Sequence, residues 1–180
     1  MGRSVRSGSL SPFVPLRSDV TAVHGAPHPS AGAGELPAIT LERVEQSLTR
    51  LGYSFVRDEE HPEVLRARFD DYRFHILLAG AHRSVLQTRG RWNHSVDISR
   101  KVEMIKLCNE WNMNRVWPKA YVRRESESVL ALYGEVNTDY LCGAADAQID
   151  RAIECGLSTV ISFFREIEAR LGSDLGPASD

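Results

Sequence analysis

The sequence predicts one α+β domain, an antiparallel sheet of about five or six strands packed against three helices. Three segments show helical spacing of apolar residues, and several short segments between them alternate apolar and polar residues. No strand–helix–strand repeat of the kind that builds a parallel sheet is visible. The expected order of elements is therefore α-β-β-β-β-α-β-β-α.

Composition narrows the class of protein. The chain has 180 residues, 42% of them hydrophobic, which is suited to a single hydrophobic core. Its formal net charge is −2, so it lacks the overall basicity of a dedicated nucleic-acid-binding protein. Its three cysteines form no C-x-x-C pair, and no apolar run is long enough for a membrane span. We expect a cytoplasmic protein that has no disulfide framework and no membrane association.

The chain divides into three parts. Residues 1–38 are rich in Ser, Gly, Pro and Ala, which predicts a disordered tail, followed by the folded domain at 39–172 and a flexible C-terminus at 173–180. The alternative for the tail is a functional arm carrying a few arginines, which would give only a weak electrostatic contact.

The first helix is predicted from about residue 41 to 51. Thr40 is a suitable N-cap, apolar residues follow at helical spacing, and Gly52 stands where a helix commonly ends. Its apolar stripe is narrow, so we expect it to lie on the sheet with its charged residues in water.

Alternation of apolar and polar residues then predicts four strands near 53–55, 65–69, 72–78 and 84–91. Asp70-Asp71 is a plausible tight turn between the second and third of them. Hairpins are the simplest connection for strands this close in sequence, so the set should be antiparallel.

The second helix is predicted from about Ile98, capped by Asp97, to about Met113. Its apolar residues form two overlapping stripes, which together cover more than half of the helix circumference. One sheet face cannot bury all of that surface, so we expect a second packing surface, either another helix of the chain or a partner subunit. The candidate partner or dimer interface comprises Ile98, Val102, Met104, Ile105, Trp111, Asn112, Trp117 and Tyr121.

Two further strands, near 116–123 and 129–136, read as a hairpin, and the third helix is predicted from about Asp146 to Leu171. Gly156 lies within the apolar stripe of this helix, where glycine costs about 1 kcal/mol relative to alanine. Its presence indicates that the helix backbone closely approaches another element.

Four distinctive short motifs follow one another along the chain: Cys108-Asn109-Glu110-Trp111-Asn112, Trp117-Pro118-Lys119-Ala120-Tyr121-Val122, Glu135-Val136-Asn137-Thr138-Asp139 and Gln148-Ile149. In these motifs the chain resembles the actinobacterial members of the YbjN family, described as bacterial sensory transduction regulators. The resemblance covers about residues 40–171 and implies a type III secretion chaperone-like fold. It also implies a regulatory or chaperone-like binding role, often through dimers, and no catalytic residues.

The region around Trp111 and Trp117 has two interpretations. Asn109, Asn112 and Asn114 are suited to cap a helix end, and a buried tryptophan could find its hydrogen-bond partner among them. Alternatively, the tryptophans and amides belong to an interface. A further alternative is a small-ligand pocket formed near Trp111, Trp117 and Tyr121.

No group with the spacing of a catalytic or metal site is present. Six histidines, at positions 24, 28, 61, 75, 82 and 94, are scattered, and nothing in the sequence pairs Cys142 with a base. Glu135, Asn137 and Asp139 are interpreted as turn and capping residues after the last strand. We therefore expect no catalytic residue, no metal and no cofactor.

Charge is unevenly distributed along the chain. Residues 83–124 hold ten Lys or Arg against three Asp or Glu, whereas residues 125–180 hold three against eleven. These regions could face each other within the fold or steer a partner or a twofold mate. Arg89, Arg91 and Trp92 could alternatively form a basic and aromatic strand face for single-stranded nucleic acid, the less favoured interpretation. The leading prediction is a non-enzymatic protein-binding or regulatory module acting as a homodimer, whose partner the sequence does not identify.

Overall fold

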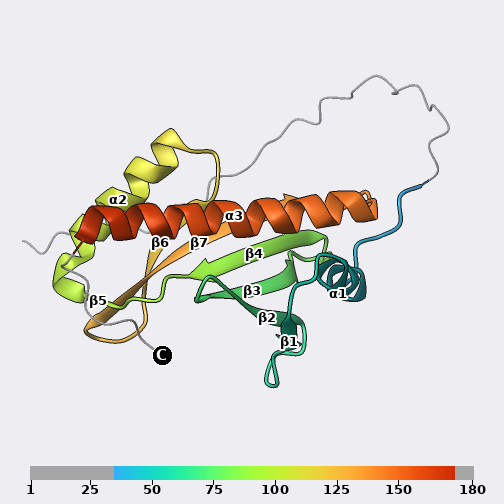
Figure 1. Cartoon of the computed structure of the whole chain (residues 1–180), viewed down its shortest axis with the longest axis horizontal. Helices are drawn as coiled ribbons and strands as arrows, with labels where there is room; N and C mark the ends of the chain where they lie inside the picture. Colours follow the sequence, from blue (N-terminus) through green and yellow to red (C-terminus); the bar gives the residue numbers. More distant parts are fainter. Residues whose placement is uncertain (1–34, 173–180) are drawn as a thin grey trace, which may run out of the picture. The chain divides into compact units, whose positions relative to one another are not determined.

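The computed structural model describes residues 35–172, so the predicted C-terminal segment and most of the predicted tail lie outside the described residues. The described chain forms three α-helices and one seven-stranded sheet (Figure 1). The elements are α1 (Leu41–Arg50), β1 (Phe55–Arg57), β2 (Val64–Phe69), β3 (Tyr72–Ala79), β4 (Val85–Arg91), β5 (Val96–Asp97), the 3-10 turn η1 (Ile98–Arg100), α2 (Lys101–Asn114), β6 (Lys119–Arg124), β7 (Val129–Asp139) and α3 (Asp146–Leu171).

Strand β7 is central to the sheet, and every strand pair is antiparallel. Strands β1 to β4 form a meander, and β4 then pairs with Tyr133–Asp139 of β7. Both β5 and β6 pair with Leu130, so they occupy opposite edges of β7. The short β5 therefore pairs with the same edge of β7 as β4 does, and β6 pairs with the other edge as an outer strand.

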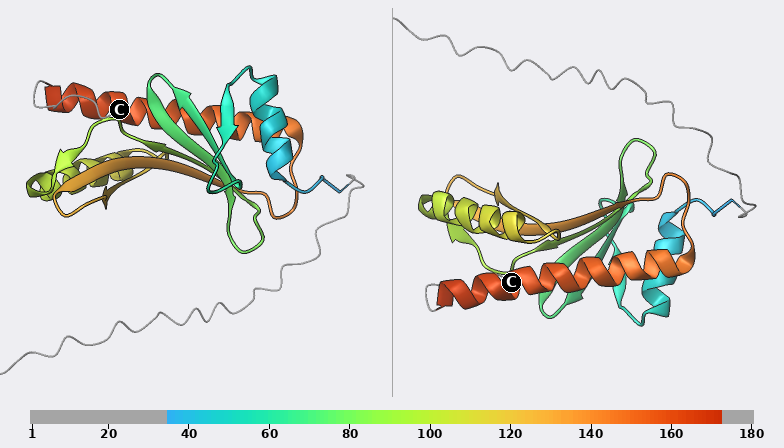
Figure 2. Two further views of the ribbon diagram at one scale, coloured as in Figure 1. Left: turned by 90° about the horizontal axis from the view of Figure 1, so that it is seen from below. Right: turned by 90° about the horizontal axis from the view of Figure 1, so that it is seen from above.

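Helices α2 and α3 pack on one face of the sheet. Seen from below, the strands lie in front of α2 and α3, whereas from above the two helices lie in front of the strands (Figure 2). Glycines allow α3 to approach closely: a β-carbon added at Gly156 would lie 2.7 Å from Thr88 Cβ, and one added at Gly90 would lie 2.6 Å from Val160 Cγ1. The close approach predicted at Gly156 is thus confirmed.

The core lies between α3 and the sheet and is rich in aromatic residues. Trp92 is fully buried, and its indole N–H donates to Glu168 Oε1 over 3.0 Å. The hydroxyl of Tyr72 donates to the same oxygen over 2.9 Å. One carboxylate of α3 therefore satisfies two polar groups that the sheet buries.

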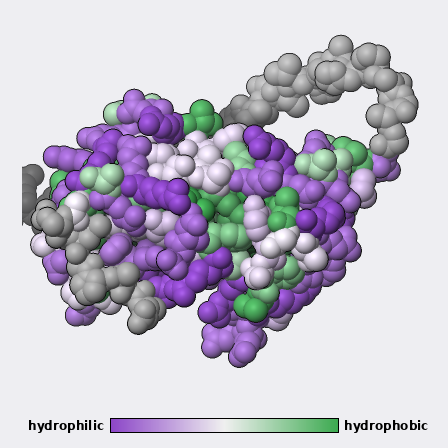
Figure 3. All heavy atoms as spheres, viewed as in Figure 1, coloured by the Kyte–Doolittle hydropathy of each residue, from purple (hydrophilic) through white to green (hydrophobic). Residues whose placement is uncertain are grey.

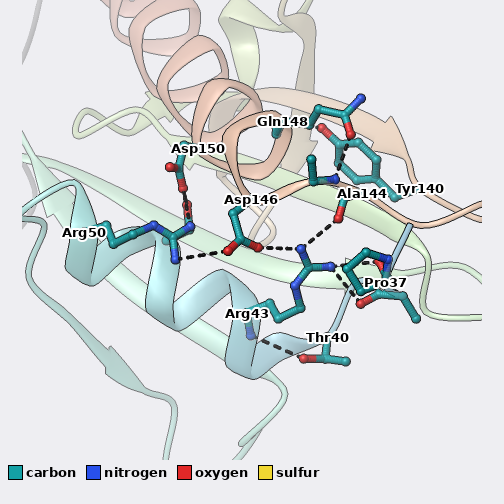
Figure 4. Close-up of polar contacts among 12 residues, drawn as sticks. Pro37, Thr40, Arg43, Arg50, Tyr140, Ala144, Asp146, Gln148 and Asp150 are labelled. Atoms are coloured by element: carbon teal, nitrogen blue, oxygen red, sulfur yellow. Dashed lines mark hydrogen bonds and ion pairs between the residues drawn. The ribbon is translucent and has the colours of Figure 1, made fainter. Parts of the chain in front are cut away.

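Helix α1 is attached to the start of α3 by a polar cluster (Figure 4). The Arg43 guanidinium donates to the carbonyl oxygens of Pro37 and Ala144 and to Asp146. Arg50 donates to Asp150 over 2.7 Å. These contacts also hold Pro37 against the domain, since the Ala144 N–H donates to the Pro37 carbonyl.

The predicted fold class and the order of the predicted elements are confirmed, with one additional short strand, β5, and differences at the strand ends. Strand β6 begins at Lys119 rather than near residue 116, because Pro118 has no N–H to contribute to a ladder. Strand β7 extends to Asp139, so Glu135 and Asn137 lie within it rather than in a turn after it. Asp139 does build a turn, by accepting from the Leu141 N–H.

Among residues 35–172, no helix combines the length and apolar character needed to cross a lipid bilayer. On the side shown in Figure 3, hydrophilic residues predominate and hydrophobic residues appear in groups between them.

Candidate docking surfaces

Helix α2 has a buried apolar face and an exposed one. Met104 and Trp111 are in the core. Val102, Ile105 and Met113 fall within about 80° on the other side of the helix. Their exposed fractions are 65%, 38% and 78%. We call these three residues the α2 stripe, and the described part of the chain leaves it open to solvent.

The junction between α2 and β6 is held by side-chain to backbone hydrogen bonds. The Trp111 indole N–H donates to the Pro118 carbonyl over 3.1 Å, so a backbone group rather than an asparagine satisfies it. The Asn112 amide donates to the Ala120 carbonyl and accepts from the Ala120 N–H, both over 2.9 Å. Asn112 thus pairs with the outer edge of β6 as a neighbouring strand would.

Tyr121 lies on the opposite face of the sheet, stacked on Tyr133 with ring centroids 5.5 Å apart. Its hydroxyl donates to Glu135, and that of Tyr133 donates to Glu125. Burial, together with the nearby Glu135 carboxylate, raises the pKa of Tyr121 to about 12. Both hydroxyls are therefore protonated and held by carboxylates of the same chain.

Glu125 and Glu135 are held ionised by different means. Hydrogen bonds from Arg91 lower the pKa of Glu125 to about 2, with a further contribution from Tyr133. Burial opposes ionisation of Glu135, but hydrogen bonds, including those from Lys119 and Tyr121, outweigh it and lower its pKa.

The predicted site residues therefore separate into different environments. Met104 and Trp111 are buried, Val102 and Ile105 are exposed on α2, Asn112 is committed to β6, and Ile98 is half-buried in η1. The predicted pocket near Trp111, Trp117 and Tyr121 does not form, because Trp111 packs on Phe163 in the core and Tyr121 lies across the sheet.

Trp117, which is 48% exposed, instead lines a hollow of about 640 Å³. The hollow lies between the end of β7 and the first half of α3. Its other lining residues are Val136, Thr138, Tyr140, Ala147, Gln148, Arg151, Ala152 and Cys155.

The face of the sheet opposite α3 carries a concentration of basic residues that sequence reasoning missed. We call it the basic array, comprising Arg66, Arg68, Arg73, His75, Arg89 and Arg91 from β2, β3 and β4. The available signal was that these residues occupy alternate positions in three neighbouring strands. Burial and the neighbouring Arg89 and Arg66 lower the pKa of His75.

The predicted nucleic-acid face of Arg89, Arg91 and Trp92 is not formed. Trp92 points into the core on the opposite side from the two arginines. Arg91 is bound to Glu125 through two hydrogen bonds of 2.9 and 2.7 Å. Only Arg89 of the three therefore lies on an open face without a carboxylate contact within the described chain.

Residues 35–172 contain no cluster of three His, Cys, Asp or Glu side chains that could hold a metal ion. Burial raises the pKa of the Cys108 thiol to about 12, so this thiol is not a nucleophile at neutral pH. Cys142 is exposed.

Comparison with known proteins places this arrangement in a family. The family model described as "Putative bacterial sensory transduction regulator", YbjN, matches residues 40–169. No curated protein matches the sequence.

Two solved structures are similar to the chain. The crystal structure of YbjN from E. coli, titled "a putative transcription regulator", has 14% identity and a TM-score of 0.66, covering 80% of this chain and 99% of that one. An uncharacterized protein from Methanothermobacter thermautotrophicus has 12% identity and a TM-score of 0.48, covering 73% and 98%. The first of these shows the shared fold, and the family match over most of the chain shows that this protein belongs to the YbjN family.

Proposed function

We propose that this chain is a non-enzymatic regulatory module that binds protein, acting as a homodimer whose subunits meet through α2. The family description supports a regulatory role. The observation that carries the proposal is the exposed α2 stripe of Val102, Ile105 and Met113. Apolar side chains gathered on one helix face gain free energy when a second apolar surface removes them from water.

A second copy is the proposed occupant of the stripe because α2 can pair with itself about a twofold axis. In such an interface the same patch is used by both subunits. Lys106 and Glu110 flank the stripe along one side, and Glu110 also accepts a hydrogen bond from Arg170 of α3. Antiparallel helices could therefore place opposite charges across the axis while the apolar residues meet at its centre.

Light scattering during size-exclusion chromatography tests the dimer. We expect a particle of twice the 20.1 kDa chain mass at micromolar concentrations. Val102→Glu combined with Ile105→Glu should shift it to the monomer, because both new charges would be desolvated in the interface. Ala169→Glu, an exposed position on α3, is the matched control and should remain dimeric. A monomeric wild-type protein would overturn the dimer.

Binding of a further protein is tested by affinity purification from the native cell followed by mass spectrometry. A specific partner retained by Ala169→Glu and lost from a folded variant at the α2 stripe would support docking through α2. Retention of the same partner by both variants would place its binding elsewhere.

A second candidate function, small-ligand sensing, rests on the hollow of about 640 Å³ beside Trp117. Pockets of this size accommodate metabolites when a few polar groups fix their orientation, and Thr138, Gln148 and Arg151 are available here. A metabolite that raises the melting temperature of the wild type but not of Ala152→Trp, which fills the hollow, would support it. A screen in which no compound stabilises the protein would count against it.

A further inference from the structure

The basic array is organised in two rows that run across three strands. In one row Arg68, Arg73 and Arg91 lie directly opposite each other on β2, β3 and β4. In the adjacent row, Arg66 and Arg89 flank His75. All six side chains point away from α3, onto the face that the helices leave uncovered.

Such rows oppose folding. Directly opposite side chains in an antiparallel pair have Cβ atoms about 4.5–5.5 Å apart, and like charges at this distance are destabilising. The lowered pKa of His75 fits a basic environment. Burial is the largest cause of the shift, and the neighbouring charges of Arg89 and Arg66 further disfavour the protonated imidazole. A sheet face selected only for stability would not line up three arginines across it.

The chain compensates only part of this charge. Asp58 contacts Arg66 over 3.3 Å, and Glu125 contacts Arg91 over 2.7 Å. Neither Arg68 nor Arg89 forms an ion pair within residues 35–172, although Glu135 lies directly opposite Arg89 on β7. The Nε atom of Arg89 is buried without an acceptor in the same part of the chain. The Arg68 side chain, which is exposed, therefore remains available to an anion from outside.

The surface is also hollowed. A depression of about 580 Å³ lies beside the basic array and is lined by residues of β1, β2, β3 and β4. Its lining includes Arg66, Arg68, Arg73, His75 and Arg91. Val56, which is 63% exposed, borders it. Asp58 also lines it, so the depression combines mainly basic groups with one carboxylate and an apolar contact.

We propose that the basic array binds an acidic segment of a partner protein. Three strands span about 10 Å, and two successive outward residues of a strand span about 7 Å. That area suits two or three carboxylates of an extended peptide. Val56 offers a place for an apolar side chain of the same peptide. This inference rests on the proposed protein-binding function but not on the dimer.

A nucleic-acid strand fits this surface less well. Tyr121 and Tyr133 stack on each other, and Tyr133 is only 8% exposed, so the pair offers little ring surface to bases.

Fluorescence polarisation with a labelled hexaglutamate peptide tests the proposal, with a labelled six-residue thymidine oligonucleotide as the competing anion. The Arg68→Gln, Arg89→Gln double variant should bind the peptide at least about tenfold more weakly, because each charge-assisted hydrogen bond contributes more than a tenfold factor. Arg83→Gln, which replaces an exposed arginine in the turn between β3 and β4, removes one positive charge instead of two and should bind the peptide within about twofold of the wild type. Affinity should fall as salt rises.

The same variants separate loss of binding from loss of folding. Because the rows repel, the double variant should melt at or above the wild-type temperature. Peptide affinity equal in the double variant and wild type, or oligonucleotide affinity equal to or above that of the peptide, would overturn the proposal. A melting temperature clearly below the wild type would contradict the repulsion on which it stands. Light scattering of the double variant should give the wild-type mass, so failure of the dimer is recognised independently.

Discussion

Replacement of Glu168 by alanine is the sharpest test of how the core is held. Its Oε1 accepts hydrogen bonds from both the Trp92 indole N–H and the Tyr72 hydroxyl. Burial and the Glu168 carboxylate raise the pKa of Tyr72, so its hydroxyl remains a donor over the whole physiological range. Glu168→Ala leaves both donors facing apolar surroundings.

The magnitude follows from the burial of the two donors. A buried polar group that loses its partner costs about 1–3 kcal/mol, which gives about 2–6 kcal/mol for two. Glu168 itself is only half-buried, so water can replace part of the lost interaction. We therefore expect a loss of about 2–3 kcal/mol in the free energy of unfolding. Glu168→Gln keeps an acceptor and should lose about 1 kcal/mol.

Urea unfolding followed by tryptophan fluorescence measures this loss. For a domain of this size, the expected change corresponds to a fall of about 4–12 °C in melting temperature. Glu154→Ala, on the same helix and half-buried, is the control and should change stability by less than about 0.5 kcal/mol. If Glu168→Ala lost no more than Glu154→Ala, the shared carboxylate would not hold Trp92 and Tyr72 in place.

Two further predictions concern acid stability and helix packing. Arg91 lowers the pKa of Glu125 to about 2 from 4.5. A depressed pKa stabilises the fold above the unfolded value and loses that contribution as pH falls toward the folded value. The Glu125→Gln variant should thus be less stable than the wild type at neutral pH, and its melting temperature should converge with that of the wild type near pH 2. Thermal melts across this pH range measure the difference. Plots of melting temperature against pH that stay parallel would contradict the ion pair. Gly156→Ala should lower the unfolding free energy by about 1 kcal/mol. The substitution gains about 1 kcal/mol in helix propensity, but overpacking against β4 costs more, because the new β-carbon would lie 2.7 Å from Thr88 Cβ. A raised urea midpoint would refute this prediction.

The sequence predicted the elements well because their signals are local. Helix α3 was predicted with the bounds that the structure shows, since its apolar stripe runs unbroken from Ile149 to Leu171. The turn at Asp70-Asp71 was predicted because Asp tolerates positive φ, and both residues adopt it. Strand β5 was missed because two residues are too short to show alternation.

The candidate surfaces depended on long-range geometry that the sequence did not reveal. Alternation predicts that Arg68, Arg73 and Arg91 point away from the core, but their alignment in one row depends on the register of two hairpins. It also required α2 and α3 to pack on the other face. The less favoured alternative that put Trp92 on the face of Arg91 fails because adjacent residues of a strand point to opposite sides.

The pairing of Asn112 with Ala120 limits how this protein can associate with others. An outer strand with unpaired N–H and C=O groups invites another chain to extend the sheet, the route to domain swapping and fibrils. Here an amide from the preceding helix occupies one such backbone pair within β6, a strand of six residues. A neighbouring strand could approach only by displacing it. Assembly is thereby directed away from growth of the sheet and toward contacts between side chains, which can be specific and can end at two copies.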